Sequence, residues 1–464
     1  MWCFMNFIKQ ILNNRIVKNS ITLINGTIIA QIINIIISPL ISRLYGPGNF
    51  GNYSNIVAII SITSIIATLK YDLAIMDREN DKYIAKNTYY LAMFSNIIIS
   101  LLIILLGIFL SIFKIFAFSF FDYIIIGLIT LFSASNIILN VWLNRSGHYK
   151  VIRNNKIIYS VFYAILSVVC GYLGFEYYGL IFSLLFSYII QFIYIYAFLL
   201  VKTDFGQYKF SMVNIKYLAK KYIKFPKFQM PAMLLNSAST QLPVILFTNL
   251  ISSTVSGWYA LTVKIINLPM TIIGQALSDI YFKEASLLKG EQKYERLKEF
   301  TYNTYKKLLV IGIIPIGIII GYGDILFEFV FGSQWYMSGV YAMLLAPWYY
   351  MVFVSSPLSH LFVILDKQKS NLILNIVVLV SRILSIIMGI YFFGRESIMV
   401  IVIFAAIGFA LWVFANGYIL KLIGISFKKT IPVSLTVLLM GASIISLPRI
   451  VMFLIWGEWI WILI

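Results

Sequence analysis

The chain has 464 residues, of which 61% are hydrophobic and only 11% are charged. Soluble domains carry about 25% charged residues, so these figures exclude a soluble globular protein. The mean hydropathy of +0.91 indicates a membrane protein with many spans. With two cysteines and two histidines, the chain lacks the residues for a disulfide framework, a metal cluster or a histidine-based catalytic array, and we expect no cofactor.

Apolar runs that are long enough to cross ~30 Å of hydrocarbon follow one another along the chain. Only helices satisfy the backbone hydrogen bonds of so many apolar segments, so we predict an all-α polytopic membrane protein. The predicted spans are 21–42, 51–69, 89–113, 121–143, 157–174, 179–201, 230–251, 257–281, 308–330, 338–365, 371–393, 397–420 and 430–447. A last run, 450–464, contains Glu458 and is either a short fourteenth span or an interfacial tail.

The Lys and Arg residues are segregated between the two sides of these spans. Of the 36, 30 lie at the N-terminus or in connections that follow even-numbered spans, and only Arg43, Lys114, Arg395 and Arg449 follow odd-numbered spans. The positive-inside rule therefore places the N-terminus in the cytoplasm. The net charge of +19 then reflects topology and contact with anionic lipid, and no nucleic-acid partner is expected.

The spans divide into two sets of six around the longest polar connection, which carries seven lysines. Six is even, so both sets enter the membrane from the same side, as in parallel repeats with a binding site between them. The short echo between Gly51-Asn52-Tyr53 and Gly257-Trp258-Tyr259 agrees with a repeat. The predicted segments are an uncleaved amphipathic lead-in (1–20), a six-helix bundle (21–201), a basic cytoplasmic linker (202–229), a second six-helix bundle (230–420) and an appendage of one or two spans (421–464).

Several polar residues lie inside the spans, where they are costly. Gln31 and Asn34 share one face of the first span, and Lys264 and Asn267 share a face of the eighth. Arg382 is at the centre of the eleventh span. Helix packing explains Ser, Thr and Gly in such positions, and Lys264 could snorkel outward. For Arg382 the alternative is a structural ion pair, but no acid is predicted at its depth. A cation that lines a cavity would bind an anionic group of a substrate.

The acidic residues offer little for catalysis or ion coupling. External connections are short and their acids are isolated, and no Walker A motif is present, so we predict a transporter and not an enzyme. Asp279, Asp324 and Glu328 are weak candidates for ion coupling because each is predicted near a membrane face. Lys70 and Asp72 end the second span at the cytoplasmic face, where we expect a snorkelling lysine that pairs with the aspartate.

Several stretches resemble the Wzx-type flippases of O-antigen and other polysaccharide pathways, in the multidrug/oligosaccharidyl-lipid/polysaccharide exporter superfamily. The matching residues extend from about 19 to 370. In the first half they are 42–47 (SRLYGP), 50–51 and 70–75 (KYDLAI). In the second half they are 222–228 (YIKFPKF), 236–237, 242–243, 257–261 (GWYAL), 267–270 (NLPM), 278–279, 331–335 (FGSQW) and 356–359 (SPLS).

The resemblance implies a V-shaped core of two six-helix bundles that alternates access between the membrane faces. The implied cargo is an oligosaccharide on undecaprenyl diphosphate, flipped from the cytoplasmic to the periplasmic leaflet of the bacterial inner membrane during lipopolysaccharide biosynthesis. A polysaccharide polymerase and its chain-length machinery would be further partners. The expected cationic cavity would include Arg43, which lies in a matching stretch near the outer mouth, whereas Lys264 and Arg382 are inferred from depth and helical face alone.

Two other readings stay open. A multidrug or organic-cation exporter of the same superfamily would need acids in the membrane, whereas the deep charges here are positive. A flippase for a capsule, exopolysaccharide or peptidoglycan precursor differs only in its cargo.

The charge segregation makes a direct prediction about topology. A reporter fused after Lys289 should register as cytoplasmic, and one fused after Gly332 should register as periplasmic, because many basic residues flank only the first position. A phosphatase and fluorescent-protein reporter pair measures both. The reverse pattern would overturn the topology and every depth assigned from it.

Overall fold

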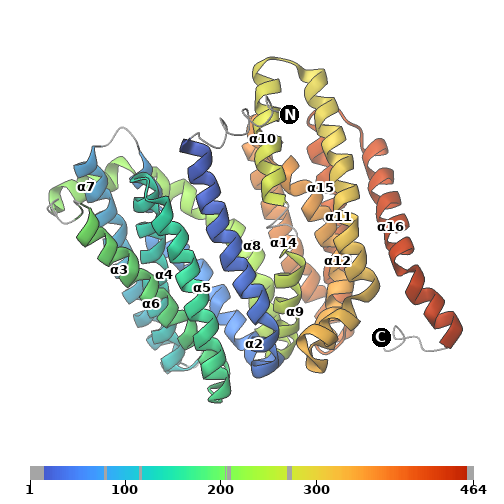
Figure 1. Cartoon of the computed structure of the whole chain (residues 1–464), viewed down its shortest axis with the longest axis horizontal. Helices are drawn as coiled ribbons and strands as arrows, with labels where there is room; N and C mark the ends of the chain where they lie inside the picture. The colour runs from blue at the N-terminus through green and yellow to red at the C-terminus, as the bar shows by residue number, and fades with distance from the viewer. Residues whose placement is uncertain are drawn as a thin grey trace, which may run out of the picture. The chain divides into compact units, whose positions relative to one another are not determined.

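The computed structural model describes residues 15–77, 81–113, 118–203, 205, 211–268 and 274–456, and the described part is helical with no strand. The prediction of an all-α fold is therefore confirmed (Figure 1). Eleven of the helices described are long and apolar enough to cross a membrane. The elements are α2 (Arg15–Thr68), η1 (Tyr71–Met76), α3 (Lys82–Ile112), α4 (Phe120–Arg145), α5 (Tyr149–Tyr172), α6 (Glu176–Lys202), α7 (Met212–Lys221), η3 (Phe225–Gln229), α8 (Met230–Leu250), α9 (Ser253–Ile266), α10 (Gln275–Gly290), α11 (Tyr294–Phe331), η5 (Ser333–Trp335), α12 (Tyr336–Leu358), α13 (Leu361–Ile364), α14 (Gln368–Phe393), α15 (Met399–Lys421) and α16 (Phe427–Trp456).

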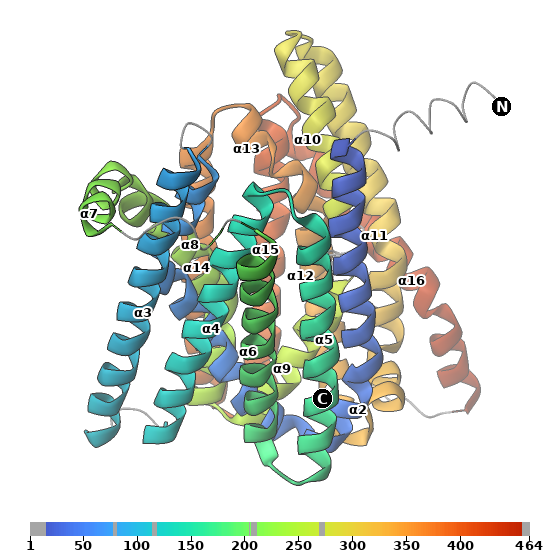
Figure 2. The same ribbon diagram turned by 60° about the vertical axis from the view of Figure 1, so that its left-hand side comes forward.

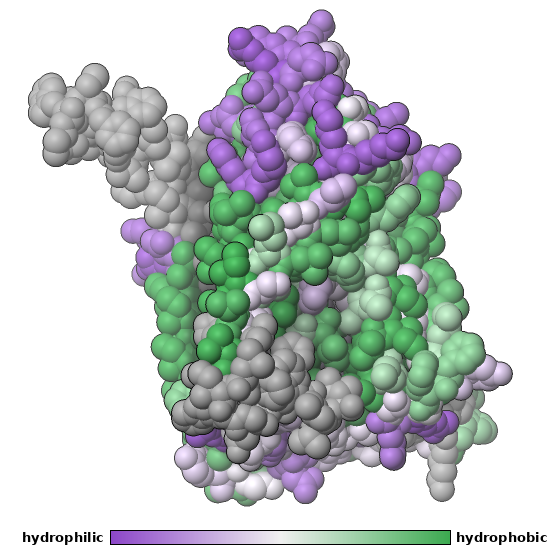
Figure 3. Space-filling model, turned by 90° about the vertical axis from the view of Figure 1, so that its right-hand side faces the viewer, coloured by the Kyte–Doolittle hydropathy of each residue, from purple (hydrophilic) through white to green (hydrophobic). Residues whose placement is uncertain are grey.

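The helices form two compact units. The first comprises Met1–Tyr45 and Asn55–Gln241, and the second comprises Gly46–Ser54 and Leu242–Ile464. Each unit thus includes a short segment from the other half of the chain. The segment boundaries predicted from sequence at 201, 230 and 420 remain predictions. On the face drawn in Figure 3, apolar residues form a band between polar ends, as a membrane-spanning protein requires.

The helix α2 contains both of the first two predicted spans. It is interrupted at Gly46, whose φ of 67° and ψ of 169° are not helical. Such a positive φ favours glycine, which has no Cβ to clash. Just before the break, the hydroxyl of Tyr45 donates a hydrogen bond to the carbonyl of Ser167 at 2.7 Å, which fixes the end of the first span to α5. The turn between the first two predicted spans is therefore built around Gly46.

After this break, the chain crosses α9 with the two backbones in direct contact. A Cβ on Gly51 would lie 1.7 Å from the carbonyl oxygen of Ser253, and a Cβ on Gly257 would lie 1.9 Å from the carbonyl oxygen of Pro47. The contact is reciprocal, because each glycine sits on the carbonyl four residues before the other. Small residues allow such close approach of helices in membranes. The glycines of the two similar motifs are therefore in contact with each other's segment, in an arrangement with approximate local two-fold symmetry.

Two predicted spans differ from the described elements. The span predicted over 257–281 includes the end of α9 at Ile266, its C-cap Asn267 and the start of α10 at Gln275, while residues 269–273 lie outside the described part. In contrast, no break separates the runs 430–447 and 450–464, because α16 continues to Trp456 and contains Arg449. Residues 457–464, like 1–14 of the predicted lead-in, lie outside the described part.

The connection between the two halves is packed onto the first unit. Ile215 and Leu218 of α7 are buried in an apolar cluster with Tyr71, Trp142 and Phe205. Further hydrogen bonds hold it there: the Tyr222 hydroxyl donates to Asp77 Oδ2 at 2.7 Å, the Tyr71 hydroxyl to the Ala219 carbonyl at 3.4 Å, and Asn214 Nδ2 to the Tyr83 hydroxyl at 3.1 Å. In Figure 2, α7 lies beside the first turns of α3.

The glycine crossing generates a stability prediction. Gly51→Ala should lower the thermal midpoint sharply and reduce the yield of monodisperse protein, because a backbone carbonyl cannot move aside as a side chain can. Overpacking of this kind costs about 1–3 kcal/mol, and occasionally more. Detergent-solubilised protein followed by size-exclusion chromatography and thermal melting measures the effect.

Gly48→Ala is the matched control, since its Cβ would meet the Thr254 hydroxyl at 3.5 Å and the Ser253 hydroxyl at 3.8 Å, both ordinary contacts. Equal behaviour of the two variants would show that the Gly51 contact is not tight in the folded protein.

Candidate functional site

In the first unit, the predicted polar face of α2 packs on α5. Asn34 Nδ2 donates to the Ser160 hydroxyl at 3.4 Å, and Lys156 Nζ donates to the Thr27 hydroxyl at 2.8 Å. Gln31, half-buried, lies between Thr27 and Asn34 on the same face of α2. The two helices carry a continuous row of amide, hydroxyl and ammonium groups, which is suited to hydrogen bonding with a polar ligand.

Lys156 is a membrane cation that the sequence reasoning missed. The apolar run was taken to begin at 157, but α5 begins at Tyr149, which places Lys156 seven residues, or about 10 Å, inside the helix. Hydropathy cannot find such a residue, because a helix continues past the end of its apolar run. The available signal was helical spacing, since Arg153, Lys156 and Ser160 recur at steps of three and four.

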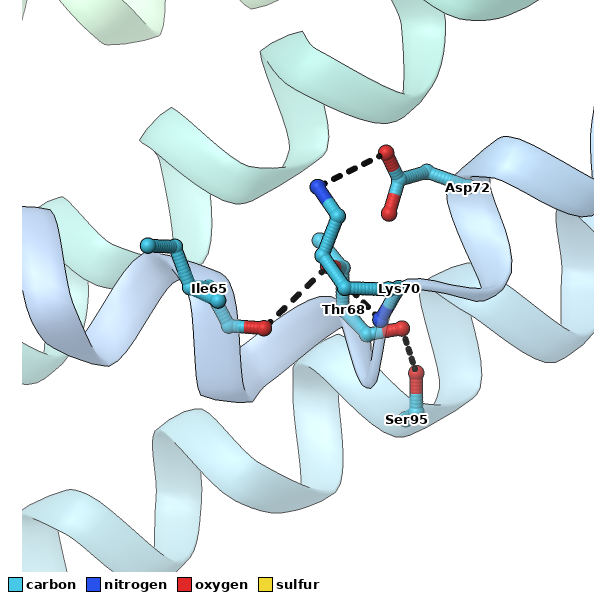
Figure 4. Close-up of polar contacts among 5 residues, drawn as sticks. All are labelled: Ile65, Thr68, Lys70, Asp72 and Ser95. Carbon is cyan, nitrogen blue, oxygen red and sulfur yellow. Dashed lines mark hydrogen bonds and ion pairs between the residues drawn. The ribbon is translucent and has the colours of Figure 1, made fainter. Parts of the chain in front are cut away.

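The predicted ion pair at the end of the second span is confirmed, but its environment differs. Lys70 Nζ lies 3.2 Å from Asp72 Oδ2, and the two side chains are only 7% and 2% exposed, so the lysine does not snorkel (Figure 4). Lys70 has a φ of 58° and ends α2, while its N–H donates to the Thr68 hydroxyl and the Ser95 hydroxyl donates to the Thr68 carbonyl. Burial also raises the pKa of the adjacent Tyr71. The motif is a buried structural junction.

A second lysine that sequence reasoning left in a connection is fully buried in the first unit. Lys86 is 1% exposed, and its ammonium lies 4.8 Å from the ring centre of Tyr89, 4.9 Å from Tyr90 and 5.6 Å from Trp142, as well as over the face of Phe205. Aromatic faces attract a desolvated cation by about 2 kcal/mol. The cage therefore fixes the start of the linker, where Phe205 lies, onto α3.

In the second unit, the predicted cation of the eighth span lies near the glycine crossing. Lys264 is in the last turn of α9, its side chain is exposed, and Nζ lies 5.9 Å from the ring centre of Phe50. Phe50 packs edge-on against the buried Trp335. Asn267 follows as the C-cap of the helix. Lys264 therefore lies in the last turn of α9, beside the segment that contains Gly51.

Arg382 lies beside an aromatic cluster of the second unit. It is half-buried in α14, and its guanidinium carbon is 5.1 Å from the ring centre of Trp348 on α12. Trp348 packs edge-on against Phe404. A guanidinium over an indole ring is a favourable cation–π arrangement.

The three acids predicted as candidates for ion coupling differ in burial and in partners. Asp324 is 2% exposed and forms a bidentate pair with Arg449 of α16, at 2.7 Å and 2.6 Å, while the same guanidinium donates to the Gly321 carbonyl. Asp279 and Glu328 are exposed and are not part of this pair. The placement of Arg449 in an external connection was therefore wrong, because it is a buried helical residue that neutralises Asp324.

The structure brings Lys264 close to the glycine crossing and Gln31 and Asn34 to α5, and it places Arg43 on the exposed surface of α2 just before Gly46. Gln31 and Asn34 belong to the first unit with Arg43, whereas Lys264, Asn267 and Arg382 belong to the second. A cavity shared by all six residues remains a prediction. Among the described residues, no group of His, Cys, Asp and Glu could hold a metal ion.

The fold is similar to those of solved membrane transporters. An inward-facing multidrug MATE transporter of the MOP superfamily matches with a TM-score of 0.62 and 14% identity, over 90% of this chain and 95% of that one. The lipid II flippase MurJ, in an inward closed conformation, matches with a TM-score of 0.59 and 14% identity, over 93% and 100% of the two chains. A MATE transporter of Vibrio cholerae matches with a TM-score of 0.54 and 12% identity, over 88% and 96%.

These likenesses define the class as a multi-pass membrane protein with the MATE and MurJ fold. A family model described as "Polysaccharide biosynthesis protein" matches residues 40–339, which is more than half of the chain, so the chain belongs to that family. The resemblance to polysaccharide flippases of the same superfamily is thus confirmed. No curated protein sequence matches the chain.

The Asp324–Arg449 pair generates a prediction that separates a structural role from ion coupling. Asp324→Leu alone should destabilise the protein by about 3–5 kcal/mol, because it leaves a buried arginine uncompensated. The double variant Asp324→Leu/Arg449→Met should recover most of this loss, and it should retain transport. A folded double variant without transport activity would instead assign Asp324 to coupling.

Proposed function

We propose that this protein flips a lipid-linked oligosaccharide, the undecaprenyl-diphosphate-linked O-antigen repeat unit, from the cytoplasmic to the periplasmic leaflet of the bacterial inner membrane. Two six-helix bundles would alternate access to a site between them. The family match carries the proposal, since a polysaccharide biosynthesis protein with a transporter fold handles a saccharide at a membrane. The protein acts in this proposal as a transporter and not as an enzyme.

The charges of the membrane-embedded residues support an anionic cargo. Lys156, Lys264 and Arg382 lie in helices of the two units, where Lys156 donates to the Thr27 hydroxyl and the other two lie beside the rings of Phe50 and Trp348. A diphosphate is the anionic part of the proposed cargo, and cations in a site of low dielectric bind it strongly. The amide and hydroxyl groups on α2 and α5 would bind sugar hydroxyls.

The buried acids argue against export of organic cations. In the described part of the chain, Asp72 pairs with Lys70, Asp122 accepts hydrogen bonds from Ser119 at an N-cap, and Asp324 pairs with Arg449. Each of these buried carboxylates therefore already has a partner in its own unit. A cationic drug would have to displace one of these partners in order to bind.

Arg382 provides the test of the cargo site. Arg382→Ala should abolish transport at normal membrane levels, with at least about a tenfold loss, because it removes the charge that would meet the diphosphate. Arg382→Lys should retain part of the activity, because it keeps the charge but loses the guanidinium beside Trp348.

The measurement is made in the native host with the gene deleted. Undecaprenyl-diphosphate-linked oligosaccharide is quantified on the cytoplasmic leaflet together with long-chain polysaccharide at the surface, and each variant is tested for rescue. Normal transport by Arg382→Ala would refute the cation model. Intact polysaccharide without accumulation in the deletion strain would refute the flippase proposal, and the sugars that accumulate would distinguish O-antigen from capsule, exopolysaccharide or peptidoglycan cargo.

A further inference from the structure

The linker helix α7 has one buried face and one exposed face of a particular composition. Ile215 and Leu218 point into the first unit, whereas Val213 and Tyr217 are 78% and 66% exposed. The exposed side chains around them are lysines, and the same composition continues to the end of η3. The exposed set, which we call the basic–apolar face, is Met212, Val213, Lys216, Tyr217, Lys220, Lys221, Ile223, Lys224, Lys227 and Phe228.

We propose that this basic–apolar face binds the anionic phospholipid headgroups of the leaflet beside it. The chain carries no Asp or Glu between 211 and 229, whereas it carries five lysines there, so all of the segment's own side-chain charges are positive. Interfacial helices combine such lysines with exposed apolar side chains, which enter the boundary between headgroups and acyl chains while the lysines meet the lipid phosphates.

The position of α7 on α3 places the face at headgroup depth. The Ser211 N–H donates to Asn87 Oδ1 at 3.3 Å, which fixes the start of α7 to the second turn of α3. The first exposed apolar side chain of the spanning part of α3 is Phe94, followed by Ile97, Ile98 and Leu101. Asn87 and Phe94 are seven residues apart, or about 10 Å along the helix. The headgroup layer lies directly outside the hydrocarbon core.

The anchoring of α7 makes the surface rigid. The hydrogen bonds from Tyr222 to Asp77 and from Asn214 to Tyr83 join α7 to η1 and α3, and the Lys86 cage holds Phe205 on α3 just upstream. A preformed face loses little conformational freedom when it binds. The linker would therefore tie the first unit to the lipid surface during transport, whatever cargo is carried.

The test uses the full chain in nanodiscs, with a nitrobenzoxadiazole probe on Val213→Cys in a background of Cys3→Ser and Cys170→Ser. Discs of neutral phosphatidylcholine are compared with discs that also contain phosphatidylglycerol, and doxyl-labelled lipid quenches the probe. We expect quenching to be greater by about threefold with phosphatidylglycerol, and to fall with salt.

A charge-matched pair of triple variants gives the decisive comparison. The variant Lys216→Gln/Lys220→Gln/Lys221→Gln should lose the dependence on phosphatidylglycerol. The control Lys283→Gln/Lys293→Gln/Lys298→Gln removes the same charge elsewhere, including lysines paired with Glu291 and Glu295. This control should retain the dependence of quenching on phosphatidylglycerol. Equal quenching in both lipids, or equal loss in both variants, would overturn the proposal. A probe that stays in water in all discs would also overturn it and would indicate a soluble partner.

Discussion

Direct contact between two backbones, at Gly51 and Gly257, is the constraint on which the architecture depends. Each glycine occupies space that any side chain would need, and each rests on a carbonyl four residues before the other. The segment Gly46–Ser54 is flanked on both sides by the first unit but packs within the second. The break at Gly46 allows the chain to change direction at the start of this segment. Within the segment, Phe50 packs on Trp335 and lies beside Lys264.

A difference between acids and bases runs through the membrane-embedded part of the described chain. The buried carboxylates are held by lysine, arginine or an N-cap, as with Asp72, Asp324 and Asp122. The cations Lys86 and Arg382 instead lie against aromatic rings, which stabilise a positive charge without cancelling it. The buried acids and these two basic residues therefore differ in the kind of group that they contact.

Much of the fold could be predicted from the sequence because hydrocarbon imposes a simple pattern. Apolar runs identified the spans, and the Lys70–Asp72 pair followed from two residues at a helix end. The helices α3 and α5 begin seven and eight residues before their apolar runs, so Lys86 and Lys156 were assigned to connections although they lie inside helices. The Asp324–Arg449 pair joins residues 125 apart, and nothing in local composition signals such a contact. The similarity between the motifs that contain Gly51 and Gly257 could be read from the sequence. That the two glycines contact each other could not.

The exchange of short segments between the units has a consequence for the independence of the two halves. A first half that ended in the linker would carry Gly46–Ser54 without the helices on which this segment packs, and it would lack Met230–Gln241, which belongs to its own unit. Neither half is therefore a complete folding module, although each contains six predicted spans. Each fragment produced by splitting the chain in the linker would therefore lack a segment that completes one of the two units.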